Sequence, residues 1–322
     1  MRVVITGGAG FIGCHLARYH AARGDEAWLI DNFSKSGTAD EEFNELARQP
    51  GITAVDADLT AQPEIELPPA VDVVYHLAAI NGTQLFYERP YDVARTNVLV
   101  TVNLLDLLQR RGTRVGRLVY SSTSEIYAGA ERYGLLRLPT DETVPAVFPQ
   151  PLPARFSYGS SKFMGEVLCS QFGATHGVPW TVIRYHNIYG PRMGGRHVIP
   201  ELIERIRKEQ RPFELRGGHE TRAFCYIDDA VKATALAAVT PACAGETVHV
   251  GNPEETRILD LAKLLMELLG FSAQIRELGS REGSVSRRCP DTAKLKRLTG
   301  FQAEVGLKAG VERTVEWYLA HA

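Results

Sequence analysis

Tyr158 and Lys162 are the residues whose types and spacing most directly suggest chemistry. They lie four positions apart at the beginning of a predicted helix, so their side chains project from one face, one turn apart. An ammonium group close to a phenol favours the phenolate, which would let Tyr158 act as a base near neutral pH. Because the same spacing occurs by chance on many helix surfaces, this interpretation needs support from elsewhere in the chain.

A hydroxyl-rich strand end gives part of that support. Residues 117–120 have the pattern of a strand, and they lead into the polar turn Ser121-Ser122-Thr123-Ser124-Glu125. A hydroxyl donor from this turn, placed beside Tyr158, would complete a site that removes a proton from an alcohol.

The run Thr6-Gly7-Gly8-Ala9-Gly10-Phe11-Ile12-Gly13 predicts a nucleotide-binding turn. Apolar, β-branched residues precede it and helical spacing follows it, so the glycines lie between a buried strand and a helix. Gly7 can take the tight turn, Gly10 lets the backbone approach a pyrophosphate, and Gly13 lets the helix pack on the strand. The free N–H groups at the start of that helix would then hold the phosphates.

Asp31 indicates which dinucleotide is bound. It ends a second apolar run, residues 27–30, where a carboxylate accepts hydrogen bonds from the ribose hydroxyls of adenosine and repels a 2′-phosphate. The sequence therefore predicts NAD rather than NADP. A solvated turn residue ahead of Asn32 is the alternative for Asp31. An oxidised nicotinamide beside Tyr158 would further favour the phenolate, so the motifs together predict proton removal from a sugar hydroxyl with hydride transfer to NAD.

Length and composition are typical of one large globular unit or of two closely joined lobes. The chain has 322 residues, 44% of them hydrophobic, and 36 basic against 38 acidic residues leave a net charge of −2. This balance gives no global field that would attract nucleic acid or a membrane. The five cysteines are scattered without a Cys-x-x-Cys pair, which favours a reducing cytoplasm and argues against a metal site. With no signal segment and no apolar run of membrane-spanning length, we expect a soluble, cytoplasmic protein.

The elements that must position these residues alternate along the chain. Strand and helix patterns follow one another from residue 1 to about 190, which predicts an α/β fold: a Rossmann-type doubly wound parallel sheet with a smaller C-terminal lobe. We expect a dinucleotide-binding domain at 1–190, carrying Tyr158 and Lys162, and a second lobe at 191–322. The expected strands are 3–5, 27–30, 52–59, 71–79, 117–125 and 180–185, with short strands near 214 and 248; the expected helices are 40–48, 91–111, 158–176, 199–207, 228–239, 259–269 and 310–320. The proline-rich segment 128–153 is expected to form a long loop.

Together these motifs resemble those of the extended short-chain dehydrogenase/reductases, in the NAD-dependent sugar-nucleotide epimerase and dehydratase family. The resemblance covers nearly the whole chain and is more specific for family and cofactor than for reaction. The matching positions are 6–13, 31–32, 58–59, 76–79, 96–97, 121–127, 158 with 162, 184–191 and 222–229.

The resemblance implies a role for each matching position. Tyr158 is the base for the substrate hydroxyl, Lys162 holds the ribose and lowers the tyrosine pKa, and Thr123 is the hydroxyl residue of the family. The implied catalytic residues are Tyr158, Lys162, Thr123 and Glu125. The implied NAD-binding residues are Gly7, Gly10, Phe11, Ile12, Gly13, Asp31, Asn32, Asp58, Leu59, Leu77, Ala78, Ala79, Asn97, Ser121, Tyr158, Lys162 and Tyr185. The implied substrate-binding residues are Tyr87, Ser124, Asn187, Arg222, Arg281 and Arg288.

For some of these residues a purely structural explanation is the alternative to a binding role. Asn187 could cap a turn, and Arg222 or Arg281 could be a solvated surface charge. For Arg222 this alternative is weak, because the residue lies inside a specific family motif.

Glu125 bears on the reaction that follows oxidation. Family members that only invert a sugar carbon often carry a small or apolar residue here, whereas those that eliminate water or carbon dioxide often keep an acid. Phe86-Tyr87 and the segments 154–158 and 287–291 also resemble the UDP-glucuronate decarboxylases, in which Arg288 falls on an arginine proposed to act near the substrate carboxylate. Against this, His197 follows Met193 by only four positions, and this loop is longer in those decarboxylases.

The resemblance implies oxidation at C4 of a nucleotide-linked sugar, with UDP as the implied nucleotide, to a transient ketone. The hydride then returns, so that NAD is regenerated. Epimerisation at C4 is the first expectation because it needs no further catalyst. Decarboxylation is the alternative, in which Arg288 would bind the carboxylate and Glu125 would donate a proton. Dehydration or another epimerisation is the third expectation.

Two further expectations concern the functional class of the protein and its oligomeric state. A non-catalytic NAD sensor is the competing class, and the intact set of Thr123, Tyr158 and Lys162 disfavours it. The resemblance also implies a homodimer formed by the helices at 91–111 and 158–176, and a mainly nucleotide-sugar-binding role for 191–322.

Overall fold

The computed structural model describes residues 1–34, 40–195, 197–280 and 284–321. Its centre is a parallel sheet of β1 (Arg2–Thr6), β2 (Glu26–Asp31), β3 (Ile52–Asp56), β4 (Ala70–His76), β5 (Arg114–Thr123), β6 (Trp180–Tyr185) and β11 (Glu246–Val250). The seven strands lie in the order β11-β6-β5-β4-β1-β2-β3. The order reverses at β1, so a crevice opens at the carboxyl ends of β1 and β4, where ligands of doubly wound sheets bind. The predicted fold class is confirmed.

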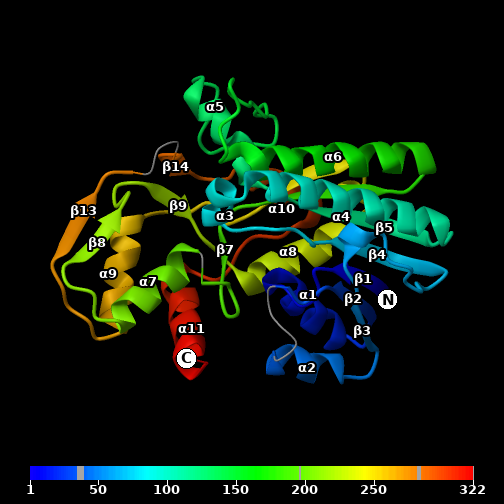
Figure 1. The fold of residues 1–322 in the computed structure, drawn as a ribbon, viewed down its shortest axis with the longest axis horizontal. Helices are drawn as coiled ribbons and strands as arrows, with labels where there is room; N and C mark the ends of the chain where they lie inside the picture. The colour runs from blue at the N-terminus through cyan, green and yellow to red at the C-terminus, as the bar shows by residue number, and fades with distance from the viewer. Residues whose placement is uncertain (35–39, 196, 281–283, 322) are drawn as a thin grey trace.

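Both faces of this sheet are covered by helices. Successive residues of β1 point to opposite sides, so Val3 and Ile5 pack in one core and Val4 packs in the other. The first core contains α1 (Phe11–Ala21) and α8 (Ile227–Val239), and the second contains α4 (Pro90–Arg110) and α6 (Phe156–His176). Figure 1 shows these pairs above and below the sheet. Buried strands with apolar residues on both sides explain why their sequences are almost continuously hydrophobic.

The remaining elements connect the sheet or form smaller sheets beside it. The connecting elements are α2 (Glu41–Ala47), η1 (Leu59–Ala61), α3 (Thr83–Glu88), η2 (Ser124–Tyr127), α5 (Ala128–Arg132), η3 (Pro241–Cys243) and α10 (Ala293–Thr299). At one end of the molecule lie α7 (Val198–Arg207), α9 (Ile258–Leu268), α11 (Leu307–Ala320), β8 (Phe213–Arg216) and β13 (Ile275–Leu278). The short strands are β7 (Ile188–Tyr189), β9 (Thr221–Ala223), β10 (Cys225–Tyr226), β12 (Glu255–Arg257) and β14 (Arg287–Arg288). They pair as β10-β7 and β12-β9-β14, while β13 pairs with β8.

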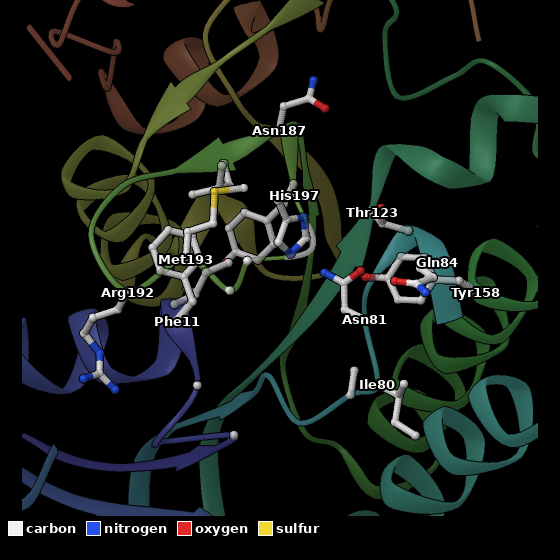
Figure 2. Close-up of a pocket in the computed structure, with 18 of the residues that line it drawn as sticks. Phe11, Ile80, Asn81, Gln84, Thr123, Tyr158, Asn187, Arg192, Met193 and His197 are labelled. Carbon is white, nitrogen blue, oxygen red and sulfur yellow. The ribbon is translucent and has the colours of Figure 1, made fainter. Parts of the chain in front are cut away.

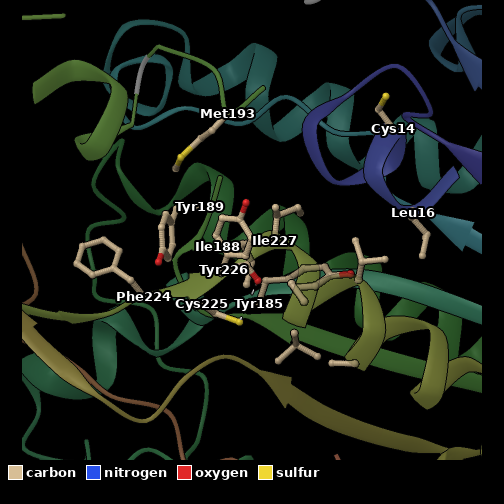
Figure 3. Close-up of a cluster of buried hydrophobic side chains, with 14 of the residues drawn as sticks. Cys14, Leu16, Tyr185, Ile188, Tyr189, Met193, Phe224, Cys225, Tyr226 and Ile227 are labelled. Atoms are coloured by element: carbon tan, nitrogen blue, oxygen red, sulfur yellow. Dashed lines mark hydrogen bonds between the residues drawn. The ribbon is translucent and has the colours of Figure 1, made fainter. Parts of the chain in front are cut away.

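An aromatic cluster joins the end of β6 to these smaller sheets. The ring of Tyr189 makes edge contacts with Phe224 at 6.0 Å and with Tyr226 at 5.6 Å between centroids. Figure 3 shows these rings beside Tyr185 and Met193. Because the cluster is buried, it fixes the polypeptide that carries residues 187 and 222 against the edge of the main sheet.

Most predicted elements are present, with differences at short segments. The helix predicted at 91–111 is observed as Pro90–Arg110, and that predicted at 158–176 as Phe156–His176. Three short helices, α3, α5 and α10, were not predicted, and α5 occupies the start of the expected loop 128–153. The strand expected near 248 is β11, which joins the main sheet. The division of the chain near residue 190 stays a prediction.

Candidate active site

One cavity of about 1870 Å³ runs along the carboxyl-terminal edge of the main sheet. It is lined by residues of the glycine turn, of the ends of β2, β4 and β5, and of the segments that carry Asn187 and Arg222. Figure 2 shows Thr123, Tyr158 and Asn81 at one end of this cavity, and Phe11 and Met193 at the other. Among the described residues, every predicted site residue lines it except Asn97. Arg281 lies outside the described residues.

The glycine turn has the shape that a dinucleotide requires. A Cβ atom on Gly13 would lie 2.1 Å from the carbonyl oxygen of Gly7, and one on Gly10 would lie 3.0 Å from the same atom. Gly7 has a φ of +71°, which side chains rarely adopt. Gly10 precedes α1 without a side-chain cap, so the first N–H groups of the helix can bind a pyrophosphate.

The acidic residue at the end of β2 is held by the turn. Asp31 accepts hydrogen bonds from the N–H groups of Ala9 at 3.1 Å and of Phe33 at 2.9 Å, one on each carboxylate oxygen. Each carboxylate oxygen can accept more than one hydrogen bond, so both remain suited to ribose hydroxyls. Asp58 also lines the cavity and accepts from the N–H of Thr60 at 2.8 Å. These residues therefore fit the NAD that the sequence predicts.

The catalytic pair lies at the other end of the cavity. Tyr158 is in the first turn of α6, and its ring stacks on Phe86 with centroids 4.7 Å apart and planes at 8°. The Lys162 ammonium donates to the hydroxyl of Ser121 at 3.2 Å and lies 4.7 Å from the centre of the Tyr120 ring. Tyr158, Lys162 and Ser121 are all buried. The helix and the end of β5 thus bring these predicted residues together.

Burial dominates the acid–base properties of this pair. It raises the pKa of the Tyr158 phenol, Glu125 raises it further, and the hydroxyl of Thr123 opposes the rise. Burial also lowers the pKa of Lys162 to about 8. In the protein without ligands Tyr158 is therefore a neutral phenol at neutral pH. Its role as base, and that of Lys162 in lowering its pKa, stay predictions that depend on the cation a bound nicotinamide would add.

Arginines surround Glu125 beside this pair. Its carboxylate lies 2.5 Å from Nη1 of Arg288 and accepts a hydrogen bond from Nη2 of Arg155 at 2.9 Å. Burial alone would raise the pKa of the Glu125 carboxyl. Arg288 opposes this effect most strongly, followed by Arg155 and Arg222, and together they lower the pKa to about 2. Arg222 is held by Glu220 at 2.7 Å, and burial and Arg288 lower its pKa to about 10. The cavity therefore contains three arginines close to one ionised carboxylate.

Two predicted residues have structural contacts as well as a place at the cavity. Asn187 has a φ of +42°, and its amide donates to the carbonyl oxygen of Ala223 at 3.1 Å. The hydroxyl of Tyr185 is bonded to the hydroxyl of Thr234 at 2.8 Å. Tyr87 lines the cavity and is 44% exposed. The roles of Asn187, Tyr185 and Tyr87 in ligand binding stay predictions.

Asn97 occupies a different place from the one expected. It is buried, does not line the cavity, and uses its side chain to bind both the N–H and the carbonyl oxygen of Ile80. Asn97 therefore contacts the segment behind the cavity wall, and its role in binding the cofactor stays a prediction.

Sequence reasoning missed some of the cavity wall. Ile80, Asn81 and Gln84 line it in the segment that follows Ala78 and Ala79, and Arg155 enters from the turn before α6. The signal for the first group was their position after a strand end at the crevice. For Arg155 the signal was its place in segment 154–158, which resembles the UDP-glucuronate decarboxylases, but its partner Glu125 is distant in the sequence.

Among the described residues there is neither a membrane-spanning helix nor a cluster of metal ligands. No helix in the described part of the chain combines the length and apolar character that a membrane span needs. Within residues 1–34, 40–195, 197–280 and 284–321, no group of three or more His, Cys, Asp or Glu side chains could hold a metal ion.

Comparison with known proteins places this geometry in context. A sequence model of the NAD dependent epimerase/dehydratase family matches residues 3–251. The chain is 32% identical to a UDP-N-acetyl-alpha-D-glucosaminuronate decarboxylase of Bacillus cytotoxicus, over 98% of this chain and 97% of that protein. It is 30% identical to a putative UDP-glucose 4-epimerase of Methanocaldococcus jannaschii, with the same coverage of 98% and 97%. Among solved structures, UDP-glucuronic acid 4-epimerase from Bacillus cereus, in complex with UDP-glucuronic acid and NAD, has a TM-score of 0.85 and 26% identity over 100% of both chains.

Proposed function

We propose, from the premise that this chain belongs to the NAD-dependent epimerase/dehydratase family, that it decarboxylates a UDP-linked uronic acid through a transient 4-keto sugar. NAD is its cofactor. The observation that carries the proposal is the ion pair of Glu125 with Arg288, reinforced by Arg155, in the same cavity as Tyr158.

The first step is shared by the reactions of the family. Tyr158, assisted by the hydroxyl of Thr123, takes the proton of the C4 hydroxyl, and Lys162 holds the ribose of the cofactor. When bound, NAD supplies the hydride acceptor, and because the hydride is returned at the end, net turnover consumes no cofactor. The stacked ring of Phe86 keeps Tyr158 in one orientation.

The second step uses the arginines. In a 4-keto uronic acid the C6 carboxylate lies beta to the ketone, so breaking the C5–C6 bond releases carbon dioxide and moves the electron pair toward the C4 oxygen. A proton from a water molecule is then added at C5, the hydride returns to C4, and Tyr158 gives its proton back to the C4 oxygen. Arg288 and Arg155 can bind the departing carboxylate by charge-assisted hydrogen bonds. Charges act strongly in this region because the side chains are largely buried.

Glu125 has a different role from the one the sequence suggests. A carboxyl with a pKa of about 2 is ionised at neutral pH, so it cannot donate the proton that C5 needs. Instead it holds Arg288 and Arg155 in place. When carbon dioxide leaves, the negative charge moves from the carboxylate to the C4 oxygen, and so away from Glu125.

C4 epimerisation is the second candidate. It requires only that the ketone rotate and accept the hydride on its other face, and the site contains all the groups for the first oxidation. The short segment between Met193 and His197 favours it, since this loop is longer in the decarboxylases that the chain resembles. A UDP-glucuronic acid 4-epimerase has the same fold over the full chain, so an anionic sugar suits this candidate too.

We also propose a homodimer that forms through α4 and α6. These helices pack side by side on one face of the sheet, and Met164 and Val167 of α6 are 47% and 40% exposed. A second copy would cover these apolar side chains. We also propose a cytoplasmic location. The chain is further proposed to divide into a NAD-binding part and a part that mainly binds the sugar nucleotide.

The test of the proposed function is a substrate panel. The purified protein is incubated with UDP-, dTDP-, CDP- and GDP-linked sugars, each as the neutral sugar and, where it exists, as the uronic acid. Mass spectrometry then shows which one loses carbon dioxide, loses water or keeps its mass. Turnover of neutral sugars alone would contradict the role assigned to Arg288 and Arg155.

A further inference from the structure

His186 is a buried histidine whose ring nitrogens bind no other described residue. It follows the end of β6 directly and is 2% exposed. Within the part of the chain that the structure describes, neither its Nδ1 nor its Nε2 has a hydrogen-bond partner. Buried polar groups nearly always have a partner, either from the protein or from ordered water. The ring of His186 is therefore a group that calls for a partner of its own.

His249, which packs against His186, shows the opposite state. Its Nδ1 lies 3.2 Å from the carbonyl oxygen of Asp291, which can only accept, so the proton of the neutral ring is on Nδ1. Its Nε2 then accepts from the hydroxyl of Tyr127 at 2.7 Å, and that hydroxyl accepts from Arg184 at 2.6 Å. The rings of His186 and His249 lie 4.5 Å apart between centroids, at 60°. This contact is aromatic, so it leaves both nitrogens of His186 unbonded.

A second, small cavity adjoins His186. Its volume is about 10 Å³, close to the space that one water molecule needs. Its lining includes the side chains of Ser124, Thr140, His186, Arg287 and Arg288. Ser124 and Arg288 also line the main cavity, whereas Arg287 is 54% exposed. The small cavity thus lies between the wall of the proposed active site and the molecular surface.

His186 is uncharged at neutral pH. Burial first, and then His249, Arg288 and Arg184, lower its pKa. A neutral imidazole has one N–H donor and one free lone pair, so either nitrogen can bind a water molecule. The small cavity is also bordered by hydroxyl groups, which gives a water there the several polar partners that an internal water requires.

The proposed decarboxylation takes one proton from solvent in every turnover. The carboxylate leaves as neutral carbon dioxide and C5 gains a hydrogen, so the net reaction consumes one proton. Glu125 is ionised and cannot supply it, and Tyr158 returns its own proton to the C4 oxygen. The departing carboxylate, which Arg288 would bind, is attached to C5. The proton must therefore reach the sugar beside Arg288, where Ser124 separates the two cavities.

We infer that His186 holds a water molecule in the small cavity, and that this water supplies the C5 proton through the hydroxyl of Ser124. The inference rests on the proposed function. Once the C5–C6 bond has broken, the enolate forms its C5–H bond with the proton of Ser124. Ser124 takes a proton from the water, and the water takes one from solvent. His186 lines the small cavity rather than the main one, so it is a positioning residue that acts through the water.

The first test removes the two ring nitrogens. His186→Phe keeps the ring that packs on His249. We expect kcat with UDP-glucuronic acid to fall about 100-fold while KM stays the same, because the proton path is lost and substrate contacts remain. His186→Gln, whose amide can bind the same water, should recover most of the rate. The matched control is His20→Phe, because His20 is also 2% exposed and lines neither of these cavities.

The position of the new hydrogen separates a proton path from a merely structural role. In D2O the unmodified protein should place deuterium on a single face of C5, because one hydroxyl delivers it. In His186→Phe and in Ser124→Ala, water from the main cavity replaces this path, so NMR of the product should show deuterium on both faces. The double variant should be no slower than Ser124→Ala alone, since both residues act on one path. Labelling of a single face by His186→Phe, at the rate of His20→Phe, would overturn the inference.

The water site is also tested without any substrate. A high-resolution crystal structure should contain one ordered water within hydrogen-bonding distance of His186 and of the Ser124 hydroxyl, and His186→Phe crystals should lack it. A His186 ring that contacts no water would refute the site even in an active protein. If the unmodified protein did not decarboxylate UDP-glucuronic acid, the proposed function and the proton path would fall together. The crystal structure would still decide whether His186 binds the water.

Discussion

The carboxylate of Glu125, at the end of β5, lies 2.5 Å from Nη1 of Arg288 on β14. This contact joins the main sheet to the small sheet that also contains Arg222. Because Arg155 approaches the other carboxylate oxygen, the pair presents a positive surface inside a cavity that also contains Tyr158. An anionic group on the substrate, next to the oxidised carbon, is what such an arrangement can recognise.

Arg288→Ala should separate oxidation from decarboxylation. Release of carbon dioxide is expected to fall about 100-fold, because the departing carboxylate loses its cation. Oxidation at C4 continues, so absorbance of the reduced nicotinamide should rise on mixing with UDP-glucuronic acid. The control is Arg287→Ala, since Arg287 is the neighbouring arginine but is 54% exposed and paired with Glu255. Equal rates of carbon dioxide release from both variants would contradict the role of Arg288.

Tyr158→Phe should abolish turnover while retaining the cofactor. The phenol supplies general base catalysis, so kcat is expected to fall by about 1000-fold. The ring still stacks on Phe86, so NAD affinity should change little. Steady-state rates and an NAD titration measure the two effects, with Tyr133→Phe on the exposed surface as control. Normal turnover by Tyr158→Phe would show that another group is the base.

Lys162→Met should stabilise the NAD-free protein at neutral pH. The folded-state pKa of Lys162, about 8, lies below the value of about 10.4 for an exposed lysine, so the unfolded state binds more protons between these values. Stability therefore rises with pH through this window, and the burial cost is fully present below pH 8. Removing the ammonium should raise the free energy of unfolding by roughly 3 kcal/mol at pH 7 and by much less near pH 10. Urea denaturation of both proteins at the two pH values measures this difference; an equal difference at both would contradict it.

Gly13→Ala should weaken NAD binding. The added Cβ would lie 2.1 Å from the carbonyl oxygen of Gly7, so the turn or the helix must shift. Such a shift should weaken the affinity for NAD by about tenfold or more, because several phosphate contacts depend on the turn. The control is Gly306→Ala, where no atom lies within 4 Å of the added carbon. Isothermal titration with NAD compares the two, and similar affinities would remove the phosphate role of this turn.

The proposed homodimer predicts sedimentation as a species of twice the chain mass at micromolar concentration. Met164→Glu with Val167→Glu should shift the protein toward monomer, because both exposed side chains would be covered in the dimer. The same charges on another helix, Leu236→Glu with Val239→Glu on α8, should leave the dimer intact. A monomer in the unmodified protein at this concentration would refute the assembly.

Local patterns in the sequence were enough to predict much of the fold and one half of the site. The glycine turn, Asp31, and the pair Tyr158 and Lys162 each depend on a few neighbouring residues, and the structure places all of them at one cavity. The main strands were predictable because burial on both faces leaves long apolar runs. Short helices such as α3 and α10 were missed because they bury few residues and show no clear periodicity.

The rest of the site depends on contacts between distant segments. Glu125 lies in η2, Arg155 in the turn before α6 and Arg288 on β14, so only the folded chain brings them together. The ionised state of Glu125 follows from that convergence, which the sequence alone does not show, so a proton-donating role was expected there. Asn97 was assigned to the cofactor, whereas the structure shows its amide bonded to Ile80. This contact depends on where the main chain of Ile80 lies in the folded protein, which no local sequence pattern predicts.

The most direct test of the central claim is the mass of the product formed from UDP-glucuronic acid. The account predicts that the protein with bound NAD releases carbon dioxide and yields a UDP-linked sugar lighter by that amount, with no net consumption of NAD. A product of unchanged mass, with an inverted C4 in its NMR spectrum, would contradict decarboxylation and establish the epimerase. If the nucleotide sugar were recovered unchanged at every protein concentration, UDP-glucuronic acid would be ruled out as the substrate.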